Sequence, residues 1–289
     1  MKEIIVIVGP TGVGKTKVGI ELAKKINGEI INADSVSIYK DLNIGSAKPT
    51  IDEQKEAIHH LINIREIDEE YSIFEYQKDC RKKIKEIESK NKRVIIVGGT
   101  GLYIKAALYN YELKEGTNNN LYDDLSNEEL LDKVKNIDPN IDIHKNNRKR
   151  LVRYLNKLEN NETIGNKKNE LLYNVKIIGL TVPRDILYDR INRRVDIMIK
   201  NNLVTEVKAL YEKCRNSRIL NTAIGYKEFY NYLYGNMKLE EVIDLIKRNS
   251  RRYAKRQYTF FNNQMDVKWF DVDIENIDKT IQNITNYIN

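Results

Sequence analysis

The pattern that points most directly to chemistry lies near the start of the chain. It has the spacing G-x-x-x-x-G-K-[ST], and its residues are Gly9, Pro10, Thr11, Gly12, Val13, Gly14, Lys15 and Thr16. An apolar run at 4–8 precedes it and an amphipathic stretch at 17–26 follows it, as in strand–loop–helix phosphate sites. In such loops backbone N–H groups and a lysine surround phosphate oxygens, and the final hydroxyl suits Mg²⁺. We therefore predict that these residues bind a diphosphate or triphosphate, with Thr16 as a metal ligand.

A carboxylate and a hydroxyl are expected beside this loop. The apolar run 93–97 ends in a glycine-rich segment that contains Thr100 and no acidic residue, whereas the run 29–33 ends at Asp34. Ligands bind at the carboxyl ends of parallel strands, so the phosphate loop, Asp34 and Thr100 should meet. One proton acceptor beside a bound diphosphate favours group transfer over ATP hydrolysis. The alternative for Asp34 is a structural role as a helix cap or turn residue.

Two basic clusters indicate a further binding surface. The first holds six basic residues and no acidic one: Lys247, Arg248, Arg251, Arg252, Lys255 and Arg256. The second comprises Lys145, Arg148, Lys149, Arg150 and Arg153. Aromatic residues flank the first cluster, at Tyr253, Tyr258, Phe260 and Phe261. A solvated basic face is the usual meaning of one such run, but two runs with aromatics favour nucleic acid, held by its backbone and stacked on its unpaired bases.

Composition sets wider limits on the protein. The chain has 289 residues, a net charge of +7 and two separate cysteines, Cys80 and Cys214. Its three histidines form no sequence cluster typical of a zinc site. No apolar run approaches the ~18 residues of a membrane span, and the first residues form a structural strand without a signal peptide. We expect a cytoplasmic monomer with no membrane association.

Apolar strands that alternate with amphipathic helices predict an α/β fold, with a P-loop NTPase-like parallel sheet covered by helices. Residues 111–172 break this pattern with polar and helical stretches, and we expect a helical insertion domain there. The core domain would then comprise 1–110 and 173–289. Expected elements within the core include a helix at 51–60 with a short strand at 61–64, and helices at 226–234 and 239–260.

The order of several further motifs resembles the tRNA dimethylallyltransferase family, also called IPP transferases. The matching blocks span nearly the whole chain and include the phosphate loop and Ala223–Glu228. The most specific are Asn32–Ser35, Gly98–Tyr103 and Ala254–Gln257, in this order. The resemblance implies that dimethylallyl diphosphate binds the phosphate loop and that its prenyl group passes to N6 of adenosine 37 in the tRNA anticodon loop. It implies that Asp34 accepts the N6 proton and that Thr100 helps to orient the transferring group, with Mg²⁺ as cofactor.

The resemblance also implies four tRNA-contacting segments, to which the basic cluster adds Arg251 and Arg252. The predicted contacts to the tRNA anticodon stem-loop are Asp34, Ser35, Val36, Ser37, Lys149, Arg150, Leu151, Val152, Arg153, Thr222, Ala223, Ile224, Gly225, Tyr226, Lys227, Arg251, Arg252, Lys255, Arg256, Gln257 and Phe260. The chain departs from the family pattern at five positions, with Ser37, Thr222 and Phe260 in place of Gln, Gln and Trp, Asn147 in place of Asp, and Asn202 in place of Gly.

Three other activities remain compatible with parts of the sequence. An adenylate isopentenyltransferase performs the same chemistry on a free nucleotide, but has little need of an insertion or of two basic clusters. A small-molecule P-loop kinase would need a metal-binding acidic residue near Val97, which the sequence lacks. A nucleic-acid-binding NTPase without transferase activity would leave Asp34 and Thr100 unexplained.

Overall fold

The computed structural model describes residues 2–111, 113, 122, 124–159 and 170–289. Their contacts divide the chain into two compact units, Met1–Tyr109 with Leu171–Asn289, and Asn110–Glu170. The polar stretches expected at 111–124 and 159–170 fall mostly outside the described residues. We call the first unit the sheet unit and the second the helical unit, and each is described by itself.

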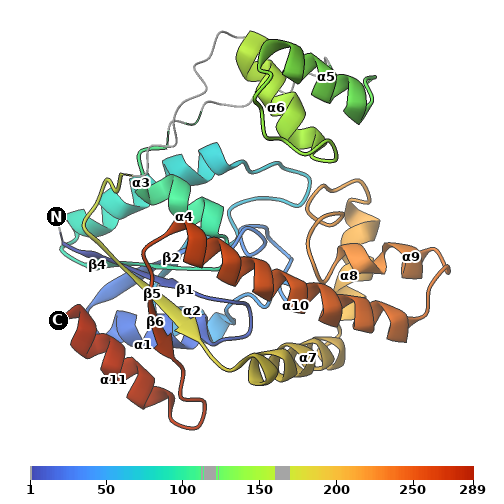
Figure 1. The fold of residues 1–289 in the computed structure, drawn as a ribbon. Coiled ribbons are helices and arrows are strands. Elements are labelled where there is room, and N and C mark those ends of the chain that lie inside the picture. Colours follow the sequence, from blue (N-terminus) through green and yellow to red (C-terminus); the bar gives the residue numbers. More distant parts are fainter. Residues whose placement is uncertain (1, 112, 114–121, 123, 160–169) are drawn as a thin grey trace. The chain divides into compact units, whose positions relative to one another are not determined.

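A six-stranded parallel sheet forms the centre of the sheet unit, with the strand order β3-β2-β4-β1-β5-β6 (Figure 1). The strands are β1 (Ile4–Val8), β2 (Gly28–Asn32), β3 (His59–His60), β4 (Arg93–Val97), β5 (Val175–Thr181) and β6 (Lys268–Asp271). Strand β4 lies between β1 and β2, so the ends of these three strands are adjacent. The predicted α/β fold with a covered parallel sheet is confirmed.

Helices cover both faces of this sheet. In Figure 1, α3 and α4 lie above the strands, whereas α1 and α11 lie below them. The helices of the sheet unit are α1 (Lys15–Lys25), α2 (Ile51–Glu56), α3 (Ile73–Ser89), α4 (Gly101–Leu108), α7 (Arg184–Lys200), α8 (Leu203–Lys213), a 3₁₀ turn η1 (Lys227–Phe229), α9 (Tyr230–Leu233), α10 (Leu239–Gln264) and α11 (Ile277–Ile288).

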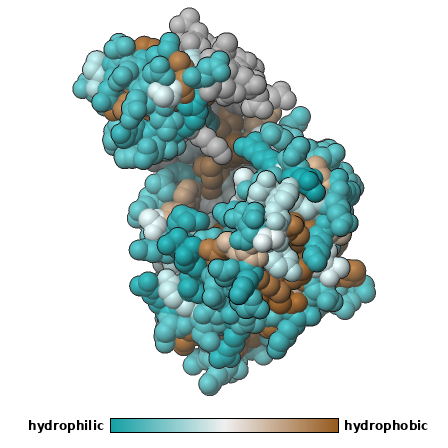
Figure 2. Space-filling model, turned by 90° about the vertical axis from the view of Figure 1, so that its right-hand side faces the viewer, coloured by the Kyte–Doolittle hydropathy of each residue, from teal (hydrophilic) through white to brown (hydrophobic). Residues whose placement is uncertain are grey.

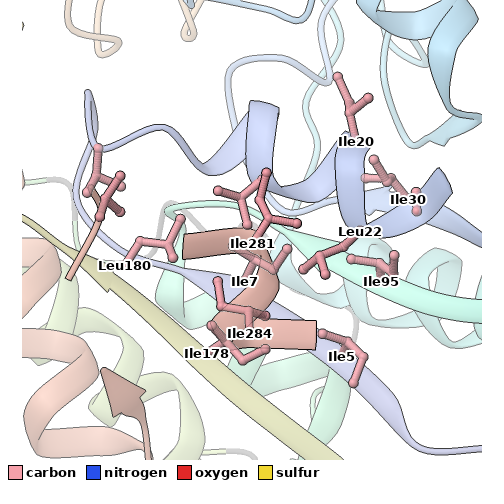
Figure 3. Close-up of a cluster of buried hydrophobic side chains, with 14 of the residues drawn as sticks. Ile5, Ile7, Ile20, Leu22, Ile30, Ile95, Ile178, Leu180, Ile281 and Ile284 are labelled. Atoms are coloured by element: carbon pink, nitrogen blue, oxygen red, sulfur yellow. The ribbon is translucent and has the colours of Figure 1, made fainter. Parts of the chain in front are cut away.

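Buried aliphatic side chains join the sheet to α1 and α11. Ile5 and Ile7 of β1 point to this side, and Leu22 of α1 with Ile281 and Ile284 of α11 pack on them (Figure 3). All five side chains are at most 1% exposed. Because successive strand residues alternate between faces, a β1 strand that is buried on both faces reads as a continuous apolar run.

The structure differs from the sequence prediction around β3 and at β6. Helix α2 was expected at 51–60 but ends at Glu56. It ends early because the Ile30 N–H donates to Ile58 O, and the residues that follow Ile58 pair with β2 in the sheet. The edge strand is therefore His59–His60, and the prediction of 61–64 is wrong. Strand β6 was not expected. It pairs with β5, and Trp269 packs beside Gly179, where no side chain intervenes.

The helical unit contains α5 (Asn127–Ile137) and α6 (Arg148–Glu159). Ser126 begins α5 with a capping box, in which its hydroxyl accepts from the Glu129 N–H and the Glu129 carboxylate accepts from the Ser126 N–H. Six buried side chains form its small core, namely Tyr122, Leu130, Val134, Ile143, Leu151 and Leu155.

The close approach of the β2 and β4 ends predicts an intolerance at Gly98. A Cβ added there would overlap the backbone of Ala33, just before Asp34. We expect Gly98→Ala to destabilise the protein by about 1–3 kcal/mol, as overpacking does, in urea unfolding. Since the overlap is with backbone atoms, the double variant Gly98→Ala/Ala33→Gly should be no more stable. A Gly98→Ala protein with the wild-type unfolding midpoint would contradict this tight packing.

Candidate active site

The phosphate loop connects β1 to α1 and is shaped by its glycines. Gly14 has a φ of 109° and caps α1 without any side-chain hydrogen bond, which leaves the helix N-terminus open to an anion. Gly9 has a φ of 140°, and a Cβ there would overlap the carbonyl oxygen of Leu180. Val13 is fully buried in the core. Because this side chain points into the core, it anchors the loop, and the backbone of the loop remains available to a ligand.

Lys15 is held inside this loop. Its Nζ donates hydrogen bonds to Gly9 O at 3.0 Å and to Pro10 O at 2.8 Å. Burial lowers the pKa of Lys15 to about 7, while the Asp34 charge opposes this shift and the Arg194 charge adds to it. An anion bound beside this desolvated lysine would stabilise its charged form and so raise its pKa.

Asp34 and Thr100 lie at the ends of the adjacent strands β2 and β4. Asp34 Oδ1 accepts from the Val36 N–H at 2.9 Å and the Ser37 N–H at 3.3 Å, so one carboxylate oxygen forms the turn that was the alternative role for this residue. Thr100 Oγ1 accepts from the Ser35 N–H at 3.1 Å, and the Thr100 N–H donates to Ala33 O at 3.0 Å. These bonds join the two strand ends, and the prediction that they meet beside the phosphate loop is confirmed.

A cavity of about 330 Å³ opens at this edge of the sheet. The phosphate loop, the end of β2, the end of β4 and helix α7 supply most of its wall. Its lining includes Thr11, Gly12, Gly14, Lys15, Thr16, Asp34, Ser37, Gly98, Gly99, Arg190 and Arg194. This volume lies within the range of small-ligand pockets, and its lining combines the carboxylates of Asp34 and Glu53 with several cationic groups.

Two arginines of α7 belong to the site, although the sequence analysis gave them no role. Arg190 Nε donates to Gly12 O at 2.9 Å, and Arg194 Nη2 donates to Thr11 Oγ1 at 2.5 Å. Arg194 Nε is buried and has no partner among the described residues. Burial lowers the pKa of Arg194, while Asp34 opposes the shift. The sequence signal that could have identified them is their spacing of four residues, which places both arginines on one face of a helix.

Helix α10 supports the site from the other side. Gln257 is 4% exposed, its Oε1 accepts from the Thr11 N–H at 2.8 Å, and its Nε2 donates to Gly99 O at 3.0 Å. One amide therefore ties the phosphate loop to the end of β4. Burial raises the pKa of Tyr253 to about 12, and the Asp34 charge adds to this shift, whereas hydrogen bonds with Thr100 and Gln257 oppose it.

The opposite face of α10 carries the first basic cluster. Arg252, Lys255 and Arg256 are exposed, while Ile246, Ser250, Ala254 and Phe261 face the interior. Lys247 Nζ forms an ion pair with Asp196 at 2.6 Å, and Arg251 Nη1 donates to Asn192 Oδ1 at 2.6 Å. The helix thus presents one basic face and one buried face, as its periodicity predicted.

Among the other residues predicted to contact RNA, some side chains are exposed and others are only partly exposed. In the helical unit Arg150 and Arg153 are exposed, Val152 is partly exposed, and Lys149 lacks a described side chain. In the segment that leads into η1, Thr222 is exposed and Ile224 is partly exposed, and Lys227, the first residue of η1, is partly exposed. The structure gives Ser35 and Val36 at the end of β2, and Phe260 on α10, partial exposure.

Six of the residues predicted to contact RNA are buried in this structure. Leu151 belongs to the core of the helical unit, and Ala223 and Gly225 are buried in the sheet unit. Tyr226 is fully buried and donates to Glu206, and Gln257 bonds internally as described above. Ser37 is also 3% exposed, and the part it shows lines the cavity. Contact of these six residues with RNA stays a prediction.

Across the described part of the chain, no helix is long and apolar enough to span a bilayer. Figure 2 shows one face of the molecule, where hydrophilic residues predominate and hydrophobic ones form scattered patches.

Comparison with known proteins places this site in a family. The IPP transferase model matches residues 37–264. The tRNA dimethylallyltransferases of Anoxybacillus flavithermus and Bacillus licheniformis are each 45% identical to the chain, over 99% of its length and 96% of theirs.

Solved structures agree with this assignment. The tRNA isopentenylpyrophosphate transferase of Bacillus halodurans has a TM-score of 0.78 and 42% identity, covering all of this chain and 96% of that one. A eukaryotic dimethylallyltransferase acting on tRNA has a TM-score of 0.84 and 29% identity, covering 99% and 78%. With these sequence and structural matches, the chain belongs to the IPP transferase family of tRNA dimethylallyltransferases.

Proposed function

We propose that this protein transfers the dimethylallyl group of dimethylallyl diphosphate to N6 of adenosine 37 in the tRNA anticodon loop. The observation that supports this most directly is the carboxylate of Asp34 at the end of β2, in a cavity that the phosphate loop and two α7 arginines also line. Family membership supports the same activity. A kinase would need a second acidic metal ligand near the phosphate loop, and the other carboxylate of the cavity lining, Glu53, is engaged in capping α2, where it accepts from the Thr50 N–H.

In the proposed reaction the allylic C–O bond breaks and its electron pair leaves with the diphosphate. Lys15, the open N-terminus of α1 and the α7 arginines would stabilise that charge. The N6 lone pair forms the new C–N bond, and the N6 proton passes to Asp34 as general base. Thr100 would orient the reacting groups, since its hydroxyl is fixed beside Ser35.

A magnesium ion fits the donor set of the cavity. The Thr16 hydroxyl lines it beside the phosphate loop, and Mg²⁺ typically takes few protein ligands and completes its shell with phosphate oxygens and water. When bound there, the ion would neutralise charge on the leaving diphosphate.

The exposed basic residues of α10 and α6 would bind the phosphates of the anticodon stem-loop, with Phe260 available for stacking. We further propose that residues 111–172 form an insertion domain for this RNA. The cytoplasmic setting and the monomeric state remain predictions. An adenylate isopentenyltransferase is the alternative, and labelled dimethylallyl diphosphate offered in parallel to tRNA, AMP and ATP would decide between them.

Asp34→Asn should lower the single-turnover rate of prenyl transfer by at least ~10²-fold, the usual contribution of a general base. The asparagine keeps an oxygen for the Val36 N–H, so the turn should survive. Filter binding should give nearly unchanged tRNA affinity. A variant that reacts at the wild-type rate would exclude Asp34 as the base.

Lys15→Ala should raise the dissociation constant for dimethylallyl diphosphate by about ten- to a hundredfold, the range for hydrogen bonds to charged groups. Because the pKa of Lys15 is near 7 and a bound anion raises it, wild-type binding at pH 8 should include proton uptake at Lys15. Calorimetry in buffers of different ionisation enthalpy should show that the alanine variant lacks this component. Lys25→Ala, at the other end of α1, serves as the control.

ATP should bind the wild-type protein poorly in the same calorimeter. Tight ATP binding with negligible binding of dimethylallyl diphosphate would instead restore the kinase interpretation.

Removing the charges of Arg251, Arg252 and Lys255 should weaken binding of anticodon stem-loop RNA. Each lost phosphate contact should reduce the slope of log affinity against log salt by roughly 0.7–0.9. Lysines at the amino ends of the strands, Lys2, Lys25 and Lys90, provide a triple-alanine control of equal charge. If both triple variants bind RNA equally well with equal slopes, the α10 face does not contact RNA.

A further inference from the structure

Glu206 on α8 makes a set of contacts that the proposed reaction does not use. Its carboxylate accepts from three consecutive backbone N–H groups, those of Asn43, Ile44 and Gly45, at 2.9–3.2 Å. It also accepts from the Tyr226 hydroxyl at 2.8 Å. Both carboxylate oxygens are thus engaged, and the donors come from two segments about 180 residues apart in sequence.

Close packing reinforces this junction. A Cβ added at Gly45 would lie 2.6 Å from the Tyr226 ring, so the ring lies directly against the loop backbone. Gly225 has a φ of 96°, and a Cβ there would lie 3.0 Å from Gly45 O. Two glycines therefore allow the two segments to touch, and Glu206 holds them from one side.

The first of these segments continues into the wall of the active-site cavity. Ser46, Ala47 and Pro49 line that cavity. Lys48, between them, is 8% exposed and donates to Tyr39 O at 2.8 Å and Asn43 Oδ1 at 3.0 Å. Lys48 thus anchors this wall through its own hydrogen bonds, and Glu206 anchors the residues just before the wall, Asn43–Gly45.

The second segment includes residues expected to meet tRNA. Tyr226 is bonded to Glu206, while Thr222 is exposed and Ile224 and Lys227 are partly exposed around it. A displacement of Tyr226 would move these neighbours. The same carboxylate thus fixes a wall of the donor cavity and a segment of the candidate RNA surface.

We propose that Glu206 is a positioning residue that couples the binding of the prenyl donor to the binding of tRNA. This inference rests on the proposed function. A donor that orders the wall at Ser46–Pro49 also orders residues 222–227 through Glu206, so each substrate should tighten the binding of the other. Glu206 touches neither substrate in this mechanism.

Two substitutions separate this role from general stability. Glu206→Gln keeps the shape but replaces one acceptor oxygen by a donor, which would oppose an N–H of the loop. Tyr226→Phe keeps the ring against Gly45 and removes only the hydroxyl bond, so the loop retains its contacts with Glu206. Glu212→Gln removes the same charge from an exposed position on the same helix and is the matched control.

The experiment measures dissociation constants for an anticodon stem-loop RNA, with and without a saturating thio-analogue of dimethylallyl diphosphate that does not react. In the wild type and Glu212→Gln, the analogue should tighten RNA binding by at least about fivefold. In Glu206→Gln this factor should fall close to one, and the analogue itself should bind about tenfold more weakly. Tyr226→Phe should lose the coupling factor while keeping near wild-type affinity for the analogue.

Thermal unfolding would identify a variant that has lost its fold, and Tyr226→Phe then carries the test alone. Coupling factors equal to wild type in the folded variants would overturn the role of Glu206, as would a wild type that binds both substrates without coupling. A wild type that binds neither RNA nor analogue would instead refute the proposed function, and the inference with it.

Discussion

The site depends on one constraint of the sheet, which is that β1, β4 and β2 are neighbours and parallel. Their carboxyl ends therefore meet at one edge, with the phosphate loop after β1, Thr100 after β4 and Asp34 after β2. Hydrogen bonds from Ser35 to Thr100 and from Thr100 to Ala33 then fix the segment around Asp34 relative to the end of β4. No single strand carries the site, and a shift in strand order would separate its parts.

Electrostatics at this edge favour an anion over a metal cluster. Lys15 and Arg194 are desolvated, and Asp34 is the counter-charge that both of them share. Arg194 also keeps a buried Nε without a partner in the described chain. Burying cations with so few partners costs stability, and a diphosphate would offset that cost by supplying acceptors. In the proposed reaction the Asp34 carboxylate would then serve as the proton acceptor.

Local sequence patterns predicted the phosphate loop and most of the strands. The parts of the site and the sheet that depend on long-range contacts could not be predicted in this way. The β4 strand and the phosphate loop have strong local signals, namely an apolar run and a glycine motif. Arg194 and Gln257 enter the site from distant helices, and nothing in their immediate neighbours indicates which loop they meet. Strand β6 is short and half polar, and it is defined by its pairing with β5.

Helix α10 packs one face against the candidate site and presents the other to solvent. Its buried face carries Gln257, which holds the phosphate loop against β4, and Phe260 packs on Gly101, where a Cβ would overlap its ring. Its other face carries the exposed cations Arg252 and Lys255. Gly101, beside Thr100, is thus required because α10 approaches it so closely that a side chain there would overlap Phe260.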